Sequence, residues 1–363
     1  MSAVDLAPAP GIPTPGAVKA KPKGGGFARY LLVRFLLIFP TIFILVTLVF
    51  FLMRTTGDPI TAAQGGRLSP EALAELRAAA GYDRPILIQY LEYLSRIAVF
   101  DFGSTLTTNR PVVEVLMTYG PATFELVFYS LIVAFAVGIP LGLAAAYYRD
   151  KAPDAIFRVL AIFWYAVPIF FAGLLLKLIF AVWLKWLPVA GRASVGAELQ
   201  LQTLPNKTGF YTIDALMTGD PAVLGDVLAH VVLPSIALGL LTAGIFLRLV
   251  RTNVIGTLST DYVDAARSRG VAESRLLRKH AYRPALIPII TVIGLQIALL
   301  LAGAVLTETT FEWKGLGFAL AEFLESRDFV AVQGIVVLLA IIVALTNFVV
   351  DIIAAFIDPR VRF

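Results

Sequence analysis

The segment DYVDAARSRGVAESRLLRKHAYR, from Asp261 to Arg283, is compact and heavily charged, and its side chains are suited to recognising a partner protein. Its spacing predicts a short helix over about 260–269, a break at Gly270 and a second, basic helix. Ala265 and Ala266 are the smallest good helix formers, so another surface could approach the backbone closely there. Gly270 suits a helix end because glycine adopts the left-handed conformation without a Cβ clash. The chemistry indicated is docking, although an ordinary basic loop would contain similar residues.

No run in the chain provides the phosphate cradle G-x-x-x-x-G-K-[ST] of an ATPase. Gly24-Gly25-Gly26 and Gly315-Leu316-Gly317 both continue with Phe and Ala instead. The sequence has no Cys, and its two histidines, His230 and His280, are too few for a His-rich metal cage. We therefore expect no enzymatic activity, cofactor or metal in this chain.

The composition places these residues in a membrane. Of the 363 residues, 58% are hydrophobic and only 15% are charged, which is far more apolar than a soluble domain. Crossing about 30 Å of hydrocarbon takes roughly 20 residues of helix. We predict an all-α integral membrane protein with six transmembrane helices, at Leu31–Met53, Thr123–Tyr147, Val159–Leu184, Val231–Val250, Ala285–Thr307 and Gly334–Phe356.

Lysine and arginine indicate the orientation, because cytoplasmic loops carry an excess of both. With the N-terminus inside, the inner segments hold 16 basic residues in 82 positions and the outer segments hold 11 in 141. The inner segments are 1–30, 148–158, 251–284 and 357–363. The outer segments are 54–122, 185–230 and 308–333. Both termini and the loop 251–284 are therefore predicted to be cytoplasmic, and the net charge of +5 reflects this face rather than nucleic-acid binding.

Residues 1–28 are rich in Pro, Gly and Ala without apolar periodicity, so we predict a disordered cytoplasmic tail. A first transmembrane helix at 29–53 follows, then an extracytoplasmic helical lobe at 54–122, whose first clear helix starts at Ser69-Pro70. Residues 123–363 form a five-helix core with an extracytoplasmic loop at 185–230.

Polar side chains within hydrocarbon are expensive and face protein or a water-filled cavity. Gln296 lies near the middle of the fifth span, between Gly294 and Gly303. Its amide could line a translocation pathway and bind peptide-like groups. Alternatively, it could hydrogen-bond to a neighbouring helix, which we favour slightly.

Charged residues near the span ends have simpler interpretations. Glu125 and Lys177 are expected near the outer face, where they can reach water. Arg34 and Asp351 lie near the inner face, and we expect a structural ion pair between them rather than a proton relay. Prolines within the spans are expected to kink their helices: Pro40, Pro140, Pro168 and Pro288.

The run Asp264-Ala265-Ala266, three residues and then Gly270 resembles the core of the cytoplasmic loop in permease subunits of binding-protein-dependent ABC importers. Asp264 stands where the broad pattern has Glu, and His280-Ala281-Tyr282-Arg283 replaces the usual closing Ile-x-Leu-Pro. Both changes resemble the oligopeptide/dipeptide/nickel branch. Further matches to this branch cover roughly 28–363, and they include Gly57-Asp58-Pro59, Gln89-Tyr90, Phe102-Gly103-Ser104, Pro111-Val112, Leu187-Pro188, Leu228–Pro234, Glu308–Trp313, Gly315-Leu316-Gly317, Arg327-Asp328, Gln333-Gly334 and Asp358-Pro359-Arg360.

This resemblance implies a type I ABC importer permease with extracytoplasmic insertions, in the inner membrane of a bacterium. Such a subunit forms the pathway together with a second related permease and hydrolyses nothing itself. Two ATP-binding cassette subunits would bind ATP and Mg, and an extracytoplasmic substrate-binding protein would deliver a dipeptide or oligopeptide. Nickel complexes and oligosaccharides are alternative substrates within the branch. An ion-gradient-driven secondary transporter is the alternative class, but its inverted repeats and midplane acidic residue are not evident.

The resemblance also assigns roles to residues of this chain. The translocation pathway would include Gln296, Gly294 and Gly303. The contacts that couple the permease to its ATPase would be made by Asp261, Tyr262, Asp264, Ala265, Ala266, Arg267, Gly270 and Arg275.

Overall fold

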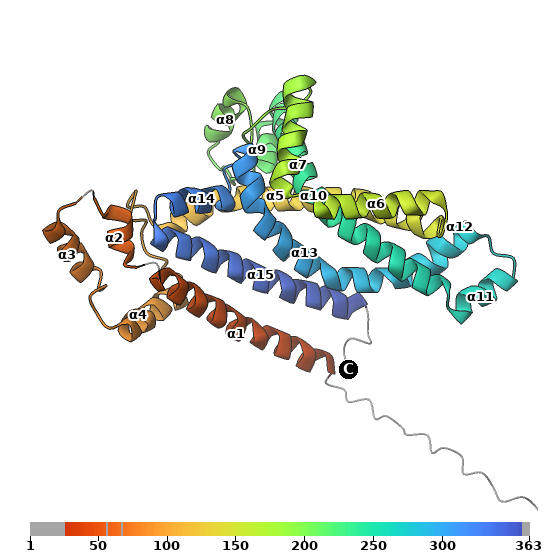
Figure 1. Cartoon of the computed structure of the whole chain (residues 1–363), viewed down its shortest axis with the longest axis horizontal. Helices are drawn as coiled ribbons and strands as arrows, with labels where there is room; N and C mark the ends of the chain where they lie inside the picture. The colour runs from red at the N-terminus through yellow and green to blue at the C-terminus, as the bar shows by residue number, and fades with distance from the viewer. Residues whose placement is uncertain (1–25, 56, 67, 358–363) are drawn as a thin grey trace, which may run out of the picture.

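The computed structural model describes residues 26–357 except 56 and 67, and the described chain is almost entirely helical (Figure 1). Most of the predicted tail, residues 1–25, lies outside the described residues. Within the described part, five helices are long and apolar enough to cross a membrane. They are α1 (Gly26–Thr55), α5 (Val112–Tyr147), α10 (Pro221–Leu258), α13 (Tyr282–Phe311) and α15 (Phe329–Ile357).

The third predicted span is a bent pair of helices instead of one straight helix. α6 (Ala152–Ala166) is followed by α7 (Ile169–Leu176), which continues into the π-helix η1 (Lys177–Trp183). The two halves differ in direction by 103°. Pro168 has no N–H to donate and disfavours the helical conformation of Val167, so both residues are extended. The kink predicted at Pro168 is thus confirmed, and it redirects the chain sharply.

α10 lies at the centre of the bundle and packs most extensively against α5. The two helices approach closely at Gly142, where an added Cβ would lie 2.8 Å from the carbonyl oxygen of Leu247. α6 is tied to α10 by a fully buried carboxylate, Asp154, which accepts two hydrogen bonds of 2.6 and 2.7 Å from Arg251. Small residues and charge-assisted hydrogen bonds therefore hold these helices together.

α1 packs along α15 at the edge of the bundle (Figure 1). The Nη1 atom of Arg34 lies 3.2 Å from the Oδ2 atom of Asp351, which confirms the predicted ion pair. Both side chains are partly exposed, so the pair fixes the register of two helices more than it contributes stability.

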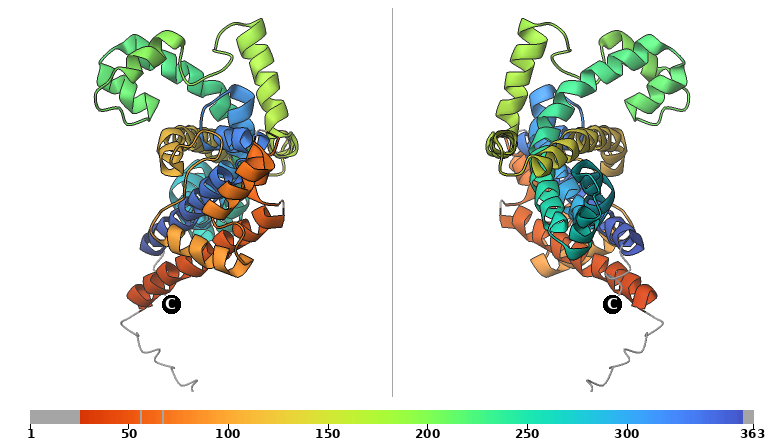
Figure 2. Two further views of the ribbon diagram at one scale, coloured as in Figure 1. Left: turned by 90° about the vertical axis from the view of Figure 1, so that its left-hand side faces the viewer. Right: turned by 90° about the vertical axis from the view of Figure 1, so that its right-hand side faces the viewer.

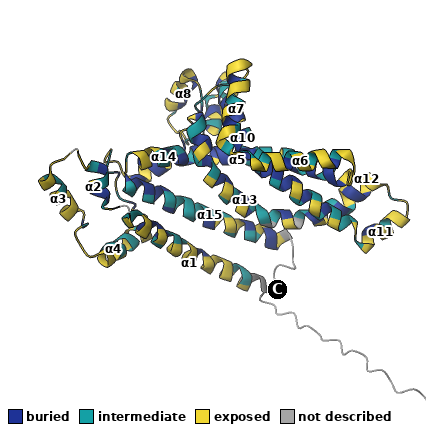
Figure 3. Ribbon diagram, in the orientation of Figure 1, coloured by how far each residue is buried: buried dark blue, intermediate teal, exposed yellow. Residues whose placement is uncertain are grey.

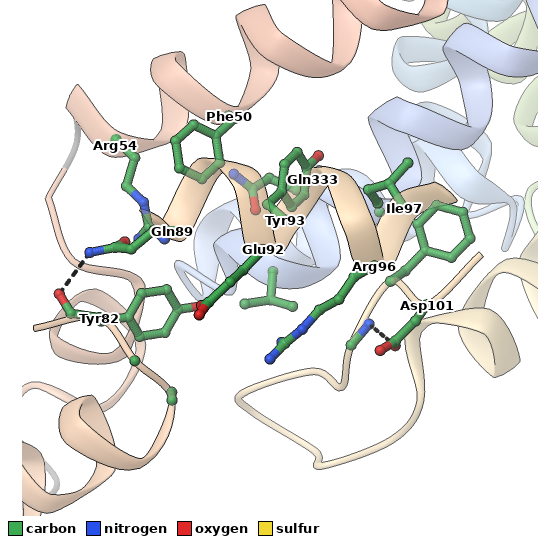
Figure 4. A pocket seen from close by; sticks show the side chains of 16 residues that line it. Phe50, Arg54, Tyr82, Gln89, Glu92, Tyr93, Arg96, Ile97, Asp101 and Gln333 are labelled. Atoms are coloured by element: carbon green, nitrogen blue, oxygen red, sulfur yellow. Dashed lines mark hydrogen bonds between the residues drawn. The ribbon is translucent and has the colours of Figure 1, made fainter. Parts of the chain in front are cut away.

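Three short helices follow α1: α2 (Pro59–Gln64), α3 (Pro70–Ala79) and α4 (Ile86–Ala98). α3 begins at the predicted Ser69-Pro70, and the Ser69 hydroxyl accepts a hydrogen bond from the Ala72 N–H. Neither α3 nor α4 has a buried residue, and α3 is mostly exposed (Figure 3). α4 contacts α1 through the rings of Tyr90 and Tyr93, which both lie near Phe50. A cavity of about 80 Å³ lies between α1, α4 and the start of α15, bordered by Tyr93 and Gln333 (Figure 4).

The second predicted outer segment folds into α8 (Val195–Gln202) and α9 (Tyr211–Thr218), and α14 (Leu316–Glu325) follows α13. Figure 2 shows α7 and the pair α8 and α9 projecting beyond the remaining helices, on opposite sides. The short helices α11 (Asp261–Ser268) and α12 (Glu273–Arg275) lie at the other end of the molecule (Figure 1).

Candidate functional site

The charged loop forms the short helix α11, close to the range 260–269 predicted from the sequence. Val263 is completely buried, and α11 packs against the π-helix η2 (Leu276–Ala281) and the end of α10. Tyr262 is half-exposed, and its hydroxyl donates a 3.1 Å hydrogen bond to the carbonyl oxygen of His280. α11 thus packs on η2, and a side-chain hydrogen bond joins the two elements.

α11 ends in a left-handed turn at Gly270, where φ is +79°, so the conformation predicted for this glycine is confirmed. The Gly270 N–H donates to the carbonyl oxygen of Arg267 at 2.9 Å, and the Val271 N–H donates to that of Ala266 at 3.3 Å. These two hydrogen bonds form a Schellman motif, which satisfies carbonyl groups left open at the helix end. The turn places α12 directly after α11.

The charges of α11 are organised around Arg267. Its guanidinium contacts Asp264, and its Nε–H donates a 2.6 Å hydrogen bond to Glu273 of α12. The hydrogen bond with Glu273 is the main cause that raises the pKa of Arg267. Asp261 and Asp264 lie in the first turn of α11, where carboxylates are favoured by the helix dipole.

The exposed surface of α11 combines acidic and small residues. Asp261, Asp264 and Ala265 are exposed, and Ala266 is half-buried. A partner could therefore reach the backbone at Ala265, while Val263 faces the rest of the chain. Arg275 is also exposed, at the end of α12.

The predicted second helix is continuous with the fifth span. α12 runs without a break into η2 and then into α13. Leu276 and Leu277 are buried, whereas Arg278 and Lys279 are exposed. A displacement of α11 would act on η2, to which the Tyr262 hydroxyl is hydrogen-bonded. η2 leads directly into the candidate membrane span α13. The ATPase-coupling role of these residues stays a prediction.

The three residues predicted for the pathway are packed within the chain. Gln296 is 3% exposed, and its Oε1 atom has no hydrogen-bond partner among the described residues. A Cβ on Gly294 would lie 2.5 Å from Oδ1 of Asn347, so this glycine permits close contact between α13 and α15. Gly303 similarly makes room for side chains of α7 and α10. The geometry gives both glycines a packing function, and their place in a pathway stays a prediction.

The expectation that Glu125 reaches water is wrong. Glu125 is 4% exposed, and its carboxylate accepts a 2.7 Å hydrogen bond from Nη2 of Arg192. The N–H and hydroxyl of Thr212 donate to the other carboxylate oxygen at 2.7 and 2.6 Å. Lys177 donates to the carbonyl oxygen of Thr310 at 2.8 Å. The segment 185–230 folds back over the end of α5 and supplies both partners of Glu125, Arg192 and Thr212, neither of which was singled out from the sequence.

A second buried carboxylate positions α14. Glu308 is completely buried near the end of α13, and it accepts hydrogen bonds from the Thr123 hydroxyl at 2.6 Å and the Phe318 N–H at 2.9 Å. The Leu316 N–H donates to Thr123 at 2.7 Å. The run from Glu308 to Gly317 thus caps the start of α14 with a side chain from α13. In the sequence, only the family resemblance had drawn attention to this run.

Comparison with known proteins agrees with this architecture. Residues 138–363 match the family described as "Binding-protein-dependent transport system inner membrane component", and residues 27–127 match the N-terminal region of the same kind of membrane component. The chain belongs to this family. The family predicted from the sequence and the all-α transmembrane fold are therefore confirmed, and the protein is a transport permease of an inner membrane.

Individual relatives match this permease over nearly its whole length. The di/tripeptide transport system permease protein DppB of Pseudomonas aeruginosa strain UCBPP-PA14 is 38% identical over 90% of this chain and 96% of its own. The dipeptide transport system permease protein DppB of Escherichia coli strain K12 is 38% identical over 92% of this chain and 98% of its own. Among solved structures, an inward-facing MetNI methionine ABC transporter matches with a TM-score of 0.49 and 16% identity, covering 65% of this chain and 93% of that one.

Proposed function

We propose that this permease is the transmembrane subunit of an ATP-driven importer of short peptides. The observation that carries the proposal is the match to dipeptide and di/tripeptide permeases at 38% identity over nine tenths of the chain. At that identity and coverage, a shared substrate class is the simplest inference.

The proposed assembly has three kinds of protein partner. A second, related permease would complete the pathway, and two ATP-binding cassette subunits would bind ATP and Mg and hydrolyse the nucleotide. An extracytoplasmic binding protein would deliver the peptide to the side of α8, α9 and α14. Both termini and the loop 251–284 would be cytoplasmic, in accordance with the distribution of basic residues.

The proposed coupling element is α11 together with its Gly270 turn. The exposed face around Asp264 and Ala265 would sit in a groove of the ATPase, with Asp261, Tyr262, Ala266, Arg267 and Arg275 around it. Closure of the two ATPase subunits would displace α11. The contacts of Val263 and Tyr262 would pass that displacement to η2 and α13. α13 contains Gln296, Gly294 and Gly303, which we propose as residues of the translocation pathway.

The test is uptake by proteoliposomes that contain this permease with its partner permease, ATPases and binding protein. Uptake of a radiolabelled dipeptide should require ATP and persist when ionophores collapse all ion gradients. The purified permease by itself should hydrolyse no ATP. Gradient-driven uptake without ATP would refute the proposal, and uptake of nickel complexes or oligosaccharides without peptide uptake would refute the substrate class.

A further inference from the structure

A cavity of about 760 Å³ opens at the predicted outer end of the permease. Its walls come from three separate parts of the chain: the first turns of α5, the segment 190–214 and the segment 312–318. Figure 1 shows α8, α9 and α14, which contribute to these walls, at one end of the bundle. The volume falls within the range of about 300–1,000 Å³ that is typical of small-ligand sites.

The base of this outer cavity is a rigid cation. Arg192 is 8% exposed, and its guanidinium lies 3.7 Å from the centre of the Tyr211 ring. Its Nη2 atom donates to Glu125 and, at 2.9 Å, to the carbonyl oxygen of Gly209. Its Nε–H is buried and has no acceptor among the described residues.

Tyr211 stacks on the Arg192 guanidinium as an uncharged side chain. Burial is the main cause that raises the pKa of Tyr211 to about 12. The tyrosine is therefore neutral at physiological pH, and its hydroxyl donates a 3.1 Å hydrogen bond to Glu198. Arg192 and Tyr211 together present a flat, stacked surface that depends on no mobile side chain.

The rim of the cavity carries both signs of charge. Glu114, Lys207, Glu312 and Lys314 line it and are exposed. None of the four forms an ion pair with another described residue. Two unpaired acids and two unpaired bases around one cavity are complementary to a ligand that has a separate positive and negative group.

We propose that this outer cavity binds a short peptide by its two charged ends. Lys207 and Lys314 would contact the terminal carboxylate, and Glu114 and Glu312 the terminal ammonium, with the peptide backbone against Arg192. Three extended residues span about 10 Å and a sphere of the cavity's volume is about 11 Å across, so the space suits two or three residues. The inference rests on the proposed peptide import and adds the first binding site for the peptide on the permease.

The decisive variant is the double substitution Lys207→Gln/Lys314→Gln, which keeps side-chain length and removes both charges. Lys185→Gln is the matched control, because Lys185 is exposed on the same outer segment but does not line the cavity. The probe is trialanine, and its binding is measured by calorimetry on the permease–ATPase complex without the binding protein. The Kd for trialanine should rise roughly 3- to 10-fold in the double variant and stay unchanged in the control, since exposed charge pairs contribute modestly.

The chemical form of the probe tests the assignment of the ends. Trialanine amide lacks the carboxylate, so it should bind the wild type more weakly and should lose little further affinity in the double variant. Equal Kd values for the double variant and Lys185→Gln would overturn the proposal. So would loss of binding-protein docking without any change in the Kd for trialanine, because the cavity would then be a docking surface.

Uptake measured on the same preparations distinguishes a failure of the cavity site from a failure of the proposed peptide import. If the wild-type importer takes up trialanine but the double variant binds it normally, the cavity site is refuted and peptide import stands. If the wild-type importer takes up no peptide, the proposed function is refuted and the cavity site falls with it.

Discussion

Replacing Gly270 is the sharpest test of the coupling element. The residue adopts φ +79° and terminates α11 through the hydrogen bonds of a Schellman motif. An added Cβ would have no other atom within 4 Å, so Gly270→Val introduces no collision within the chain. The perturbation is therefore conformational strain of about 1–2 kcal/mol for a residue with a Cβ in the left-handed region.

A strain of that size shifts the population of the correct turn by roughly 5- to 30-fold. The turn fixes α12 relative to α11, so α11 should present its exposed face to the ATPase less often. Gly270→Asn is the matched control, because asparagine occupies this position at helix ends more readily than other residues with a Cβ. Both variants should insert into the membrane normally, since Gly270 lies outside the candidate spans.

The assay combines membrane insertion, co-purification of the ATPase subunits and peptide uptake on the same preparations. Gly270→Val should retain insertion and lose ATPase association, or hydrolyse ATP without uptake, whereas Gly270→Asn should stay close to wild type. If Gly270→Val assembles and transports like wild type, α11 and its turn do not couple the permease to the ATPase. If Gly270→Asn fails as badly as Gly270→Val, bulk at a partner interface is responsible instead of backbone strain.

The remaining predictions concern individual contacts. Asp264→Arg reverses an exposed charge in the first turn of α11 and should reduce ATPase co-purification while membrane insertion is unchanged. Glu125→Ala leaves the Arg192 guanidinium buried without the carboxylate that pairs with it, so the free energy of unfolding in denaturant titrations should fall by about 3–5 kcal/mol. Arg34→Ala breaks a partly exposed ion pair, so the free energy of unfolding should fall by at most about 1 kcal/mol. Gly142→Val should shift α5 from α10 and lower the thermal midpoint, and an unchanged midpoint would contradict the close approach seen there. Deleting 68–80 removes α3, which has no buried residue, and should abolish binding-protein docking while the ATPases stay bound; unchanged uptake would contradict this role.

Features that depend on neighbouring residues alone could be read from the sequence. Apolar runs of about 20 residues imply spans because backbone groups must be satisfied within a helix in hydrocarbon. The start of α3 at Ser69-Pro70 and the left-handed Gly270 follow from steric preferences of single residues, and the structure has both. The ion pair of Arg34 and Asp351 was predictable because two charges at the same membrane face have few other partners.

Only the tertiary structure decided which distant groups meet. Glu125 was expected to reach water, yet it is buried against Arg192, 67 residues away in the chain. Glu308 holds the start of α14 through Thr123, 185 residues away. The bend at Pro168 was expected, but its angle of 103° depends on the packing around it. Hydropathy determines which segments enter the membrane, whereas the partner of a buried charge depends on how the loops fold over the helix ends, and no local pattern records that geometry.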